Sequence, residues 1–245
     1  MHTILITGFG RFPGSPVNPS GPVATRLARR RRPAFAETRR VAHVFATCYD
    51  AVDRELPALL AREKPDVVVM FGVATRSRQV RVEERARNRI ALLPDAGRRR
   101  PSMQTIALHR DALRNPLPLA RLVTAARTMG VAAARSRNAG SYLCNYAYWR
   151  GLEARAQPGG PHLVIFIHVP PVGIKKVPKK PRRQGRRQPP GAGNRRAPGI
   201  GDLVRAGEAI LQTVIALSRE ARSCEPVVFP RHEESDKGRR ELSDR

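Results

Sequence analysis

Short, almost unbroken apolar runs recur along the chain at residues 3–7, 67–71 and 163–167. Strands buried on both faces of a parallel sheet have this composition, whereas strands with one wet face alternate between apolar and polar residues. Weaker runs at 40–46 and 131–135 predict two further strands. The run at 163–167, Leu-Val-Ile-Phe-Ile, is the most hydrophobic of these and predicts a central strand.

Between the strands, apolar residues at helical spacing predict helices. These helices extend from Ser20, as N-cap, to about Arg30, from Ala51 to Lys64, from Leu117 to Met129, and from Gly201 onward as the longest helix. Because strands and helices alternate, the sequence predicts a single α/β domain. We expect a mostly parallel, twisted sheet with helices on both faces, an α/β/α sandwich.

Residues 79–90 depart from this pattern, since charged and apolar side chains alternate there. Such alternation predicts a strand with one face in solvent. We expect this strand to pair with residues 104–108 as an antiparallel hairpin excursion, with residues 94–101 forming the loop between them.

A large part of the formal net charge of +26 lies in one segment. Residues 175–196 contain ten basic residues and no acidic one, interleaved with Pro and Gly. Because the segment lacks apolar residues to bury, we expect a flexible insert at 175–199 within a domain of residues 1–222. A charged, disordered tail is predicted at 223–245.

The same basic segment carries the alternative function. Its cations can bind phosphates without sequence preference, so a nucleic-acid-binding or otherwise non-catalytic protein remains open as the second interpretation. The cysteines show no spacing typical of disulfides or zinc sites, and no apolar run is long enough to cross a membrane. Because a strand is predicted from residue 3, we expect no signal peptide. We therefore expect a cytoplasmic protein without a membrane anchor, a metal or another cofactor.

Cys144 is the candidate nucleophile. It follows the turn-forming Ala139-Gly140-Ser141 step and lies at the head of a segment with helical character. Unpaired amides and partial positive charge at a helix N-terminus favour a thiolate and can receive an oxyanion. A cysteine beside Leu143 and Tyr146 can also be a small buried hydrophobe, and that interpretation stays open here.

Residues near strand ends supply partners for such a nucleophile. His168 follows the central strand, and the loop after the first strand carries Phe9, Phe12 and Asn18. Carboxyl ends of parallel strands share the edge of a sheet where α/β proteins bind ligands. With Glu83, the chain has the thiol, imidazole and carboxylate that a thiol hydrolase needs. The alternative is that the two phenylalanines plug the core and that the histidine is structural.

Three separate motifs resemble the pyroglutamyl peptidases of type I (pyrrolidone carboxyl peptidases), a family of cysteine peptidases. The resemblance covers most of residues 3–170 and continues into the last helix. The first motif comprises Ile6-Thr7-Gly8-Phe9, Phe12 and Asn18-Pro19-Ser20. The second places Glu83 eleven positions after Gly72, followed by Ala86 and Asn88. The third comprises Ser136, Ala139-Gly140, Tyr142, Cys144-Asn145 and Phe166-Ile167-His168-Val169-Pro170.

The resemblance implies a peptidase that removes N-terminal pyroglutamate from peptides through a thioacyl-enzyme. It implies Cys144 as nucleophile, His168 as general base and later general acid, and Glu83 as the residue that orients His168. A homo-oligomer, often a tetramer in the family, is a further implication.

The resemblance also implies the groups that bind the substrate. Phe9 and Phe12 would sandwich the flat lactam ring, the Asn18 side chain would meet its polar edge, and the backbone near Val73 would complete its recognition. Aromatic walls with a few placed hydrogen bonds suit a neutral lactam.

Two departures from the family pattern affect the expected pocket. Common members carry an arginine after the glutamate, within a string similar to Asp-Ala-Arg-Ile-Pro-Asp. This chain has Ala91-Leu92-Leu93-Pro94-Asp95 there, and Arg89 or Arg78 are the candidates to replace the missing arginine. The first loop reads Phe12-Pro13-Gly14 in place of Phe-Gly-Gly, which can reshape the pocket and change its substrate range.

Overall fold

The computed structural model describes residues 2–12, 15–108, 111–172 and 197–223. Residues 175–196 of the predicted insert and 224–245 of the predicted tail lie outside these ranges. Both therefore stay predictions.

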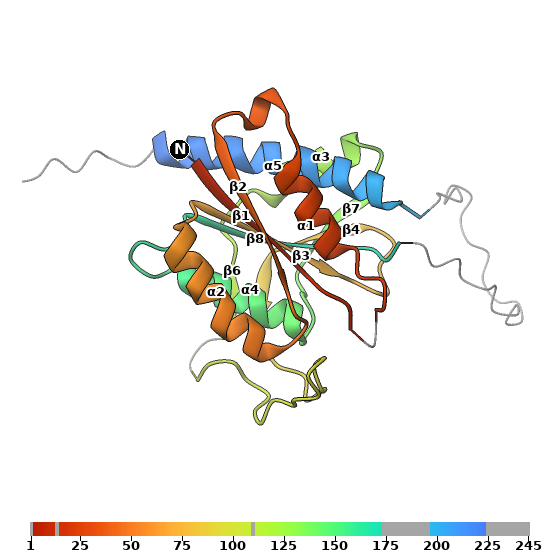
Figure 1. Cartoon of the computed structure of the whole chain (residues 1–245), viewed down its shortest axis with the longest axis vertical. Coiled ribbons are helices and arrows are strands. Elements are labelled where there is room, and N and C mark those ends of the chain that lie inside the picture. The colour runs from red at the N-terminus through yellow and green to blue at the C-terminus, as the bar shows by residue number, and fades with distance from the viewer. Residues whose placement is uncertain (1, 13–14, 109–110, 173–196, 224–245) are drawn as a thin grey trace, which may run out of the picture.

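A six-stranded sheet with the order β2-β1-β3-β8-β4-β7 forms the centre of the molecule (Figure 1). Its strands are β1 (His2–Phe9), β2 (Thr38–Phe45), β3 (Val67–Val73), β4 (Val80–Glu83), β7 (Ala133–Ser136) and β8 (Leu163–Val169). The helices are α1 (Ser20–Arg29), α2 (Tyr49–Glu63), α3 (Leu119–Thr128), α4 (Leu143–Arg155) and α5 (Ile200–Ser223), with a 3₁₀ turn η1 (Pro33–Phe35).

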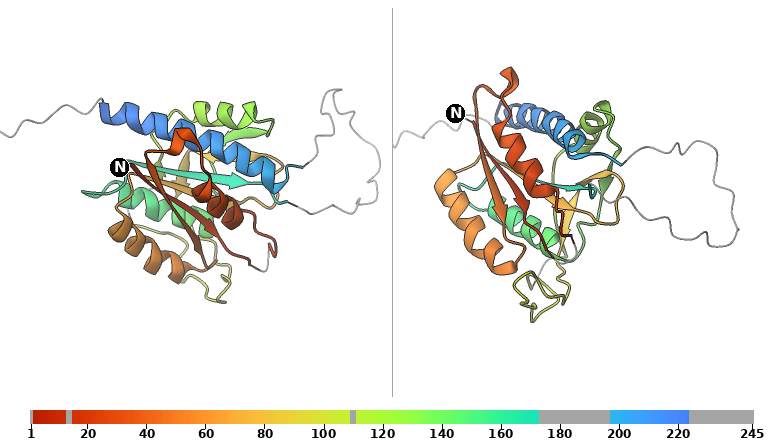
Figure 2. Two further views of the ribbon diagram at one scale, coloured as in Figure 1. Left: turned by 45° about the horizontal axis from the view of Figure 1, so that its top comes forward. Right: turned by 45° about the vertical axis from the view of Figure 1, so that its right-hand side comes forward.

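The helices cover both faces of the sheet, so the predicted α/β/α sandwich is confirmed. α1, α3 and α5 pack on one face, and α2 and α4 pack on the other (Figure 2). Successive residues of the central strands alternate between the two cores, as Val67 and Val68 of β3 do. The strands predicted from unbroken apolar runs are therefore buried on both faces. No helix within the described ranges is both long and apolar enough to span a bilayer.

The sheet is mostly parallel, but its last two strands run the other way. β1, β2, β3 and β8 are parallel neighbours, whereas β4 pairs antiparallel with β8 and parallel with β7. The antiparallel excursion predicted for 79–90 therefore exists, but the predicted partner was wrong. β4 joins the main sheet, and β5 (Arg85–Arg87) pairs with β6 (Ala112–Arg114) instead of with 104–108.

One side chain explains why residues 104–108 form no ladder. Asn88 Oδ1 accepts hydrogen bonds from the backbone N–H groups of Ile106 (2.6 Å) and Ala107 (2.9 Å), and its Nδ2 donates to the carbonyl of Ala107 (2.6 Å). A side chain that satisfies these backbone groups takes the place of a pairing strand.

The start of α1 is fixed tightly against the end of β1. The predicted N-cap role of Ser20 was wrong, because Ser20 is the first residue of the helix and Pro19 occupies the cap position. The Ser20 hydroxyl instead accepts a hydrogen bond from the Phe9 N–H (3.0 Å) and donates to Asn18 Oδ1 (2.8 Å). A Cβ at Gly8 would lie 2.5 Å from the Ser20 carbonyl oxygen, so only glycine allows this approach.

We predict that Gly8→Ala lowers the free energy of unfolding by about 1–3 kcal/mol, because backbone must move to admit the methyl group. Gly10→Ala is the matched control, since its Cβ would meet only the Phe45 carbonyl oxygen, at 3.5 Å. We expect the control to stay within about 0.5 kcal/mol of the parent protein. Urea unfolding of both variants measures this, and equal stabilities would contradict the close approach at Gly8.

Candidate active site

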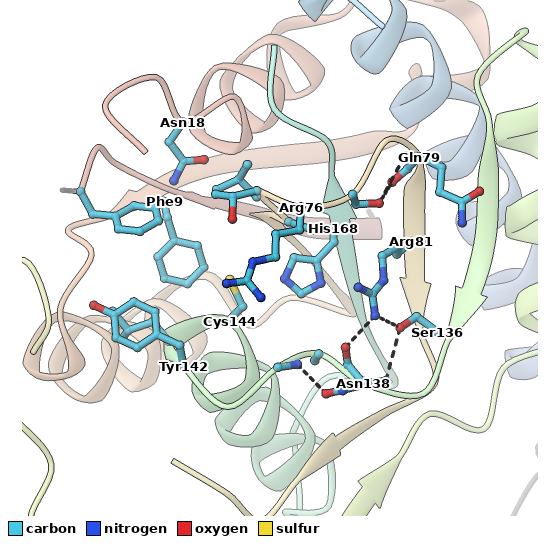
Figure 3. Close-up of a pocket in the computed structure, with 18 of the residues that line it drawn as sticks. Phe9, Asn18, Arg76, Gln79, Arg81, Ser136, Asn138, Tyr142, Cys144 and His168 are labelled. Atoms are coloured by element: carbon cyan, nitrogen blue, oxygen red, sulfur yellow. Dashed lines mark hydrogen bonds between the residues drawn. The ribbon is translucent and has the colours of Figure 1, made fainter. Parts of the chain in front are cut away.

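A cleft of about 1940 Å³ opens where β1, β3 and β8 end (Figure 3). Most of the predicted site residues line it: Phe9, Phe12, Asn18, Val73, Cys144 and His168. Glu83 is the exception, since its side chain is fully buried beneath the floor of the cleft. Within the described part of the chain, no group of three or more His, Cys, Asp or Glu residues could hold a metal ion.

Cys144 is the second residue of α4, as the sequence predicted, and it is a half-buried free thiol. The residue before the helix, Tyr142, has extended backbone and provides no side-chain cap. The first amides of α4 therefore have no capping side chain as a partner. A Cβ at Gly72 would lie 2.7 Å from the Cys144 sulfur, so the glycine of the second motif provides the room that the thiol occupies.

His168 and Glu83 come from neighbouring antiparallel strands. Arg81 of β4 pairs with His168 of β8, so Glu83 lies two residues further along β4 on the same face and deeper in the sheet. The His168 Nδ1 lies 2.9 Å from the Glu83 Oε1, and the two side chains are 7% and 0% exposed. The predicted pairing of carboxylate and imidazole is thus present in the geometry.

The surroundings of His168 favour its charged form. Burial by itself lowers the pKa of His168, but the charge and hydrogen bond of Cys144 and those of Glu83 outweigh burial and raise the pKa to about 9. The imidazole therefore interacts with the sulfur on one side and with the carboxylate on the other. At neutral pH this arrangement holds His168 as an imidazolium.

Arg81 is a second cation on the buried carboxylate, and the sequence did not single it out. Its Nε lies 3.4 Å from Glu83 Oε1, the same oxygen that faces His168. Its Nη2 donates to the Asn138 carbonyl (2.8 Å) and to the Ser136 hydroxyl. Arg81 therefore links the carboxylate to the turn that leads into Cys144. Gln79 and Arg81, on the face that the alternation predicted to meet solvent, line the cleft, and Glu83 of the same face is buried.

Residues that flank the thiol attach α4 to the strands around Glu83. Asn145 is fully buried, accepts a hydrogen bond from the Arg87 N–H (2.8 Å) and donates to the Arg87 carbonyl (2.7 Å). The Tyr148 hydroxyl donates to the Glu83 carbonyl (3.0 Å). This explains why an asparagine follows the cysteine in the third motif: Asn145 anchors the helix that carries the thiol to the strand after Glu83.

Aromatic rings form one end of the cleft. Phe9 and Phe12 both line it, as predicted, and Tyr142 adds a third ring whose centroid lies 6.4 Å from that of Phe12. The Tyr142 hydroxyl donates to the Pro94 carbonyl (2.9 Å), and burial is the main cause of its raised pKa. Sequence reasoning placed Tyr142 in a motif but missed it as a wall of the pocket.

Asn18 has a structural role as well as a place in the cleft. Its Oδ1 accepts hydrogen bonds from the Ser20 N–H and hydroxyl, and its Nδ2 donates to the Gly10 carbonyl. One amide hydrogen is left for a ligand. The pairing of β3 with β1 ends at Met70, whereas its pairing with β8 continues to Val73. The edge of β3 on the β1 side is therefore unpaired near Val73.

The two arginines proposed to replace the family's missing arginine lie in different places. Arg78 lines the cleft, in the loop between β3 and β4. Arg89 is exposed and is not part of the cleft wall.

A family model described as pyroglutamyl peptidase matches residues 2–184. Pyrrolidone-carboxylate peptidase 1 of Ralstonia nicotianae is 34% identical over 176 residues, which cover 69% of this chain and 79% of that protein. The pyrrolidone-carboxylate peptidase of Clavibacter michiganensis subsp. michiganensis is 35% identical over 173 residues, which cover 69% and 79%.

Solved structures share the fold. The pyrrolidone carboxyl peptidase from Thermococcus litoralis has a TM-score of 0.75 at 26% identity, covering 94% of this chain and all of that one. Pyroglutamyl peptidase I of Bacillus amyloliquefaciens has a TM-score of 0.73 at 23% identity, covering 89% of this chain and 98% of that one. At this identity the similarity shows only a shared fold. The family model and the relatives confirm the resemblance seen in the three motifs, and the chain belongs to the pyroglutamyl peptidase family of hydrolases.

Proposed function

We propose that the protein is a cysteine peptidase that removes N-terminal pyroglutamate from peptides. The observation that carries this proposal is the chain of contacts from buried Glu83 through His168 to Cys144, at the floor of a cleft with aromatic walls. A nucleophile, a proton carrier and a group that fixes the carrier's orientation are what acyl transfer through a thiol requires.

The aromatic end is proposed to hold the lactam ring. Phe12 and the small exposed part of Phe9, which is 2% accessible, offer apolar surface to the ring, and the free amide hydrogen of Asn18 can donate to the lactam carbonyl. The edge of β3 near Val73 can accept the lactam N–H through its backbone. These few polar contacts would orient a neutral ligand in an otherwise apolar pocket.

In the proposed reaction the Cys144 thiolate attacks the carbonyl carbon that joins pyroglutamate to the next residue. The oxyanion that forms lies toward the first amides of α4. The C–N bond then breaks, and His168 gives its proton to the leaving amine, which departs with the shortened peptide. Neutral His168 next takes a proton from water, the hydroxide breaks the thioester, and pyroglutamate leaves as the thiolate and imidazolium are restored.

Replacing the nucleophile tests the proposal directly. We expect Cys144→Ala to lower the rate of release of a fluorescent amine from its pyroglutamyl amide by roughly 10⁴-fold or more. Cys48→Ala is the matched control, because Cys48 is the other half-buried free thiol in the described structure and lies outside the cleft wall. Full activity in Cys144→Ala would refute the assignment, as would its loss in Cys48→Ala with Cys144 intact.

The role of Glu83 can be tested on His168 itself. We expect Glu83→Gln to lower the pKa of His168 from about 9 toward its ordinary 6.5, because the hydrogen bond and charge of the carboxylate both raise it. NMR titration of the imidazole measures the change. Glu84→Gln is the control, since the neighbouring Glu84 pairs with Arg137 and Arg135 instead. A pKa that is unchanged in Glu83→Gln would contradict the orienting role.

The raised pKa also fixes one side of the pH dependence of catalysis. The imidazolium is present at neutral pH and is lost as the pH rises through about 9, so kcat/KM should fall above that pH. In Glu83→Gln the same fall should begin at lower pH. A pH–rate profile of both proteins measures this. If the fall at high pH occurs at the same pH in both, deprotonation of His168 does not cause it.

Three further sequence predictions accompany the proposal and stay predictions: a cytoplasmic location, assembly into a homo-oligomer such as a tetramer, and non-specific binding of nucleic acid through residues 175–196. The last of these rests on a segment outside the described residues. None of them is needed for the chemistry proposed here.

A further inference from the structure

The cleft has two chemically different ends, with the proposed catalytic pair between them. Figure 3 shows Phe9, Asn18 and Tyr142 on one side of Cys144 and His168, and Gln79, Arg81 and Ser136 on the other. If the lactam ring occupies the aromatic end, the rest of the peptide must leave across the polar end. This orientation rests on the proposed function.

The polar end carries arginines that are not neutralised. Arg76 and Arg78, from the loop between β3 and β4, line the cleft and are exposed. Neither side chain has a hydrogen bond or an ion pair with any other residue in the described ranges. Figure 3 shows Arg76 reaching into the cleft toward Cys144 and His168.

The other cations at this end differ, because each already has a carboxylate. Arg81 contacts Glu83, and Arg135 lies 3.7 Å from Glu84. Arg76 and Arg78 therefore stand out among these cations as the two without a carboxylate partner in the described part of the chain.

The acidic residues of the cleft wall do not offset them. Asp95 accepts hydrogen bonds from the backbone N–H groups of Tyr49 and Arg99, and Asp202 accepts one from Gly199 and pairs with Arg205. Each carboxylate already has donors of its own. The polar end thus presents excess positive charge to whatever leaves the site.

We propose that Arg76 and Arg78 form a carboxylate-binding subsite for the residue that follows pyroglutamate. The preferred substrates carry a carboxylate there, either as an acidic side chain or as the free C-terminus of a dipeptide. The guanidinium group presents paired donors that match a carboxylate, and the attraction strengthens where the cleft excludes water. A carboxylate near the Cys144 thiolate would otherwise be repelled, and the arginines remove that penalty.

Matched peptides that differ only in charge test this subsite. The first pair is pyroglutamyl-glutamate amide against pyroglutamyl-glutamine amide, and the second is pyroglutamyl-alanine against its amide. For the parent protein we expect kcat/KM to be roughly fivefold higher for the charged member, within the range that accessible ion pairs provide. The preference should shrink as salt screens the charges. The pair of peptides that shows the preference identifies whether the subsite binds an acidic side chain or a free C-terminus.

The double variant Arg76→Gln, Arg78→Gln should bring the ratio close to one. The ratio compares charged and neutral peptides on the same protein, so any effect of the substitutions on both members of a pair cancels. Arg98→Gln is the control, because Arg98 also lines the cleft but lies in the turn after Pro94, the residue whose carbonyl accepts the Tyr142 hydroxyl at the aromatic end. It removes one positive charge, against the two that the double variant removes, and should leave the ratio unchanged.

The outcomes separate the two proposals. Cleavage of all four peptides without a charge preference, or a preference that survives in the double variant, would overturn the subsite and leave the peptidase proposal standing. A loss of preference in Arg98→Gln equal to that in the double variant would replace the subsite by a general effect of charge. Failure to cleave any of the peptides would overturn the proposed function and the subsite with it.

Discussion

The hydrogen bond between the buried Glu83 carboxylate and the His168 imidazole is the constraint on which the site depends. A carboxylate with no exposed surface is costly unless it is paired, and here a histidine and an arginine face the same oxygen. The pairing requires β4 to lie beside β8 in one register, since a slip of one residue would turn Glu83 to the other face. Strand order, strand direction and chemistry are therefore determined together.

The helix that carries the thiol is held by the same region of the sheet. Tyr148 bonds the backbone of Glu83, Asn145 bonds the segment that follows it, and Arg81 reaches the turn before the helix. Gly72 leaves the space that the sulfur occupies. These contacts join α4, or the turn before it, to β3, β4 or β5, so the thiol is positioned from several sides and not by its own loop alone. Acyl transfer requires such rigid positioning.

The sequence was informative wherever burial determines the pattern. Unbroken apolar runs predicted β1, β3 and β8, and the family motifs located Cys144 and His168, which line the cleft where these strands end. Alternation at 79–90 identified a strand but not its partner, because a period of two gives the face of a strand and not its neighbour. Arg81 was missed for the same reason, since a polar face toward a cleft and one toward solvent have the same pattern. Ser20 was misassigned because its hydroxyl bonds a strand that is distant in the sequence.

The central claim is that the Cys144 sulfur receives the acyl group beside an imidazolium held by Glu83. The acyl group on Cys144 can be measured most directly by mass spectrometry. The protein is mixed rapidly with a pyroglutamyl ester, quenched with acid and digested before the measurement. We expect a transient increase in mass equal to one pyroglutamyl group, located on the peptide that contains Cys144. Turnover of the ester with no such adduct, or an adduct on another residue, would contradict the account.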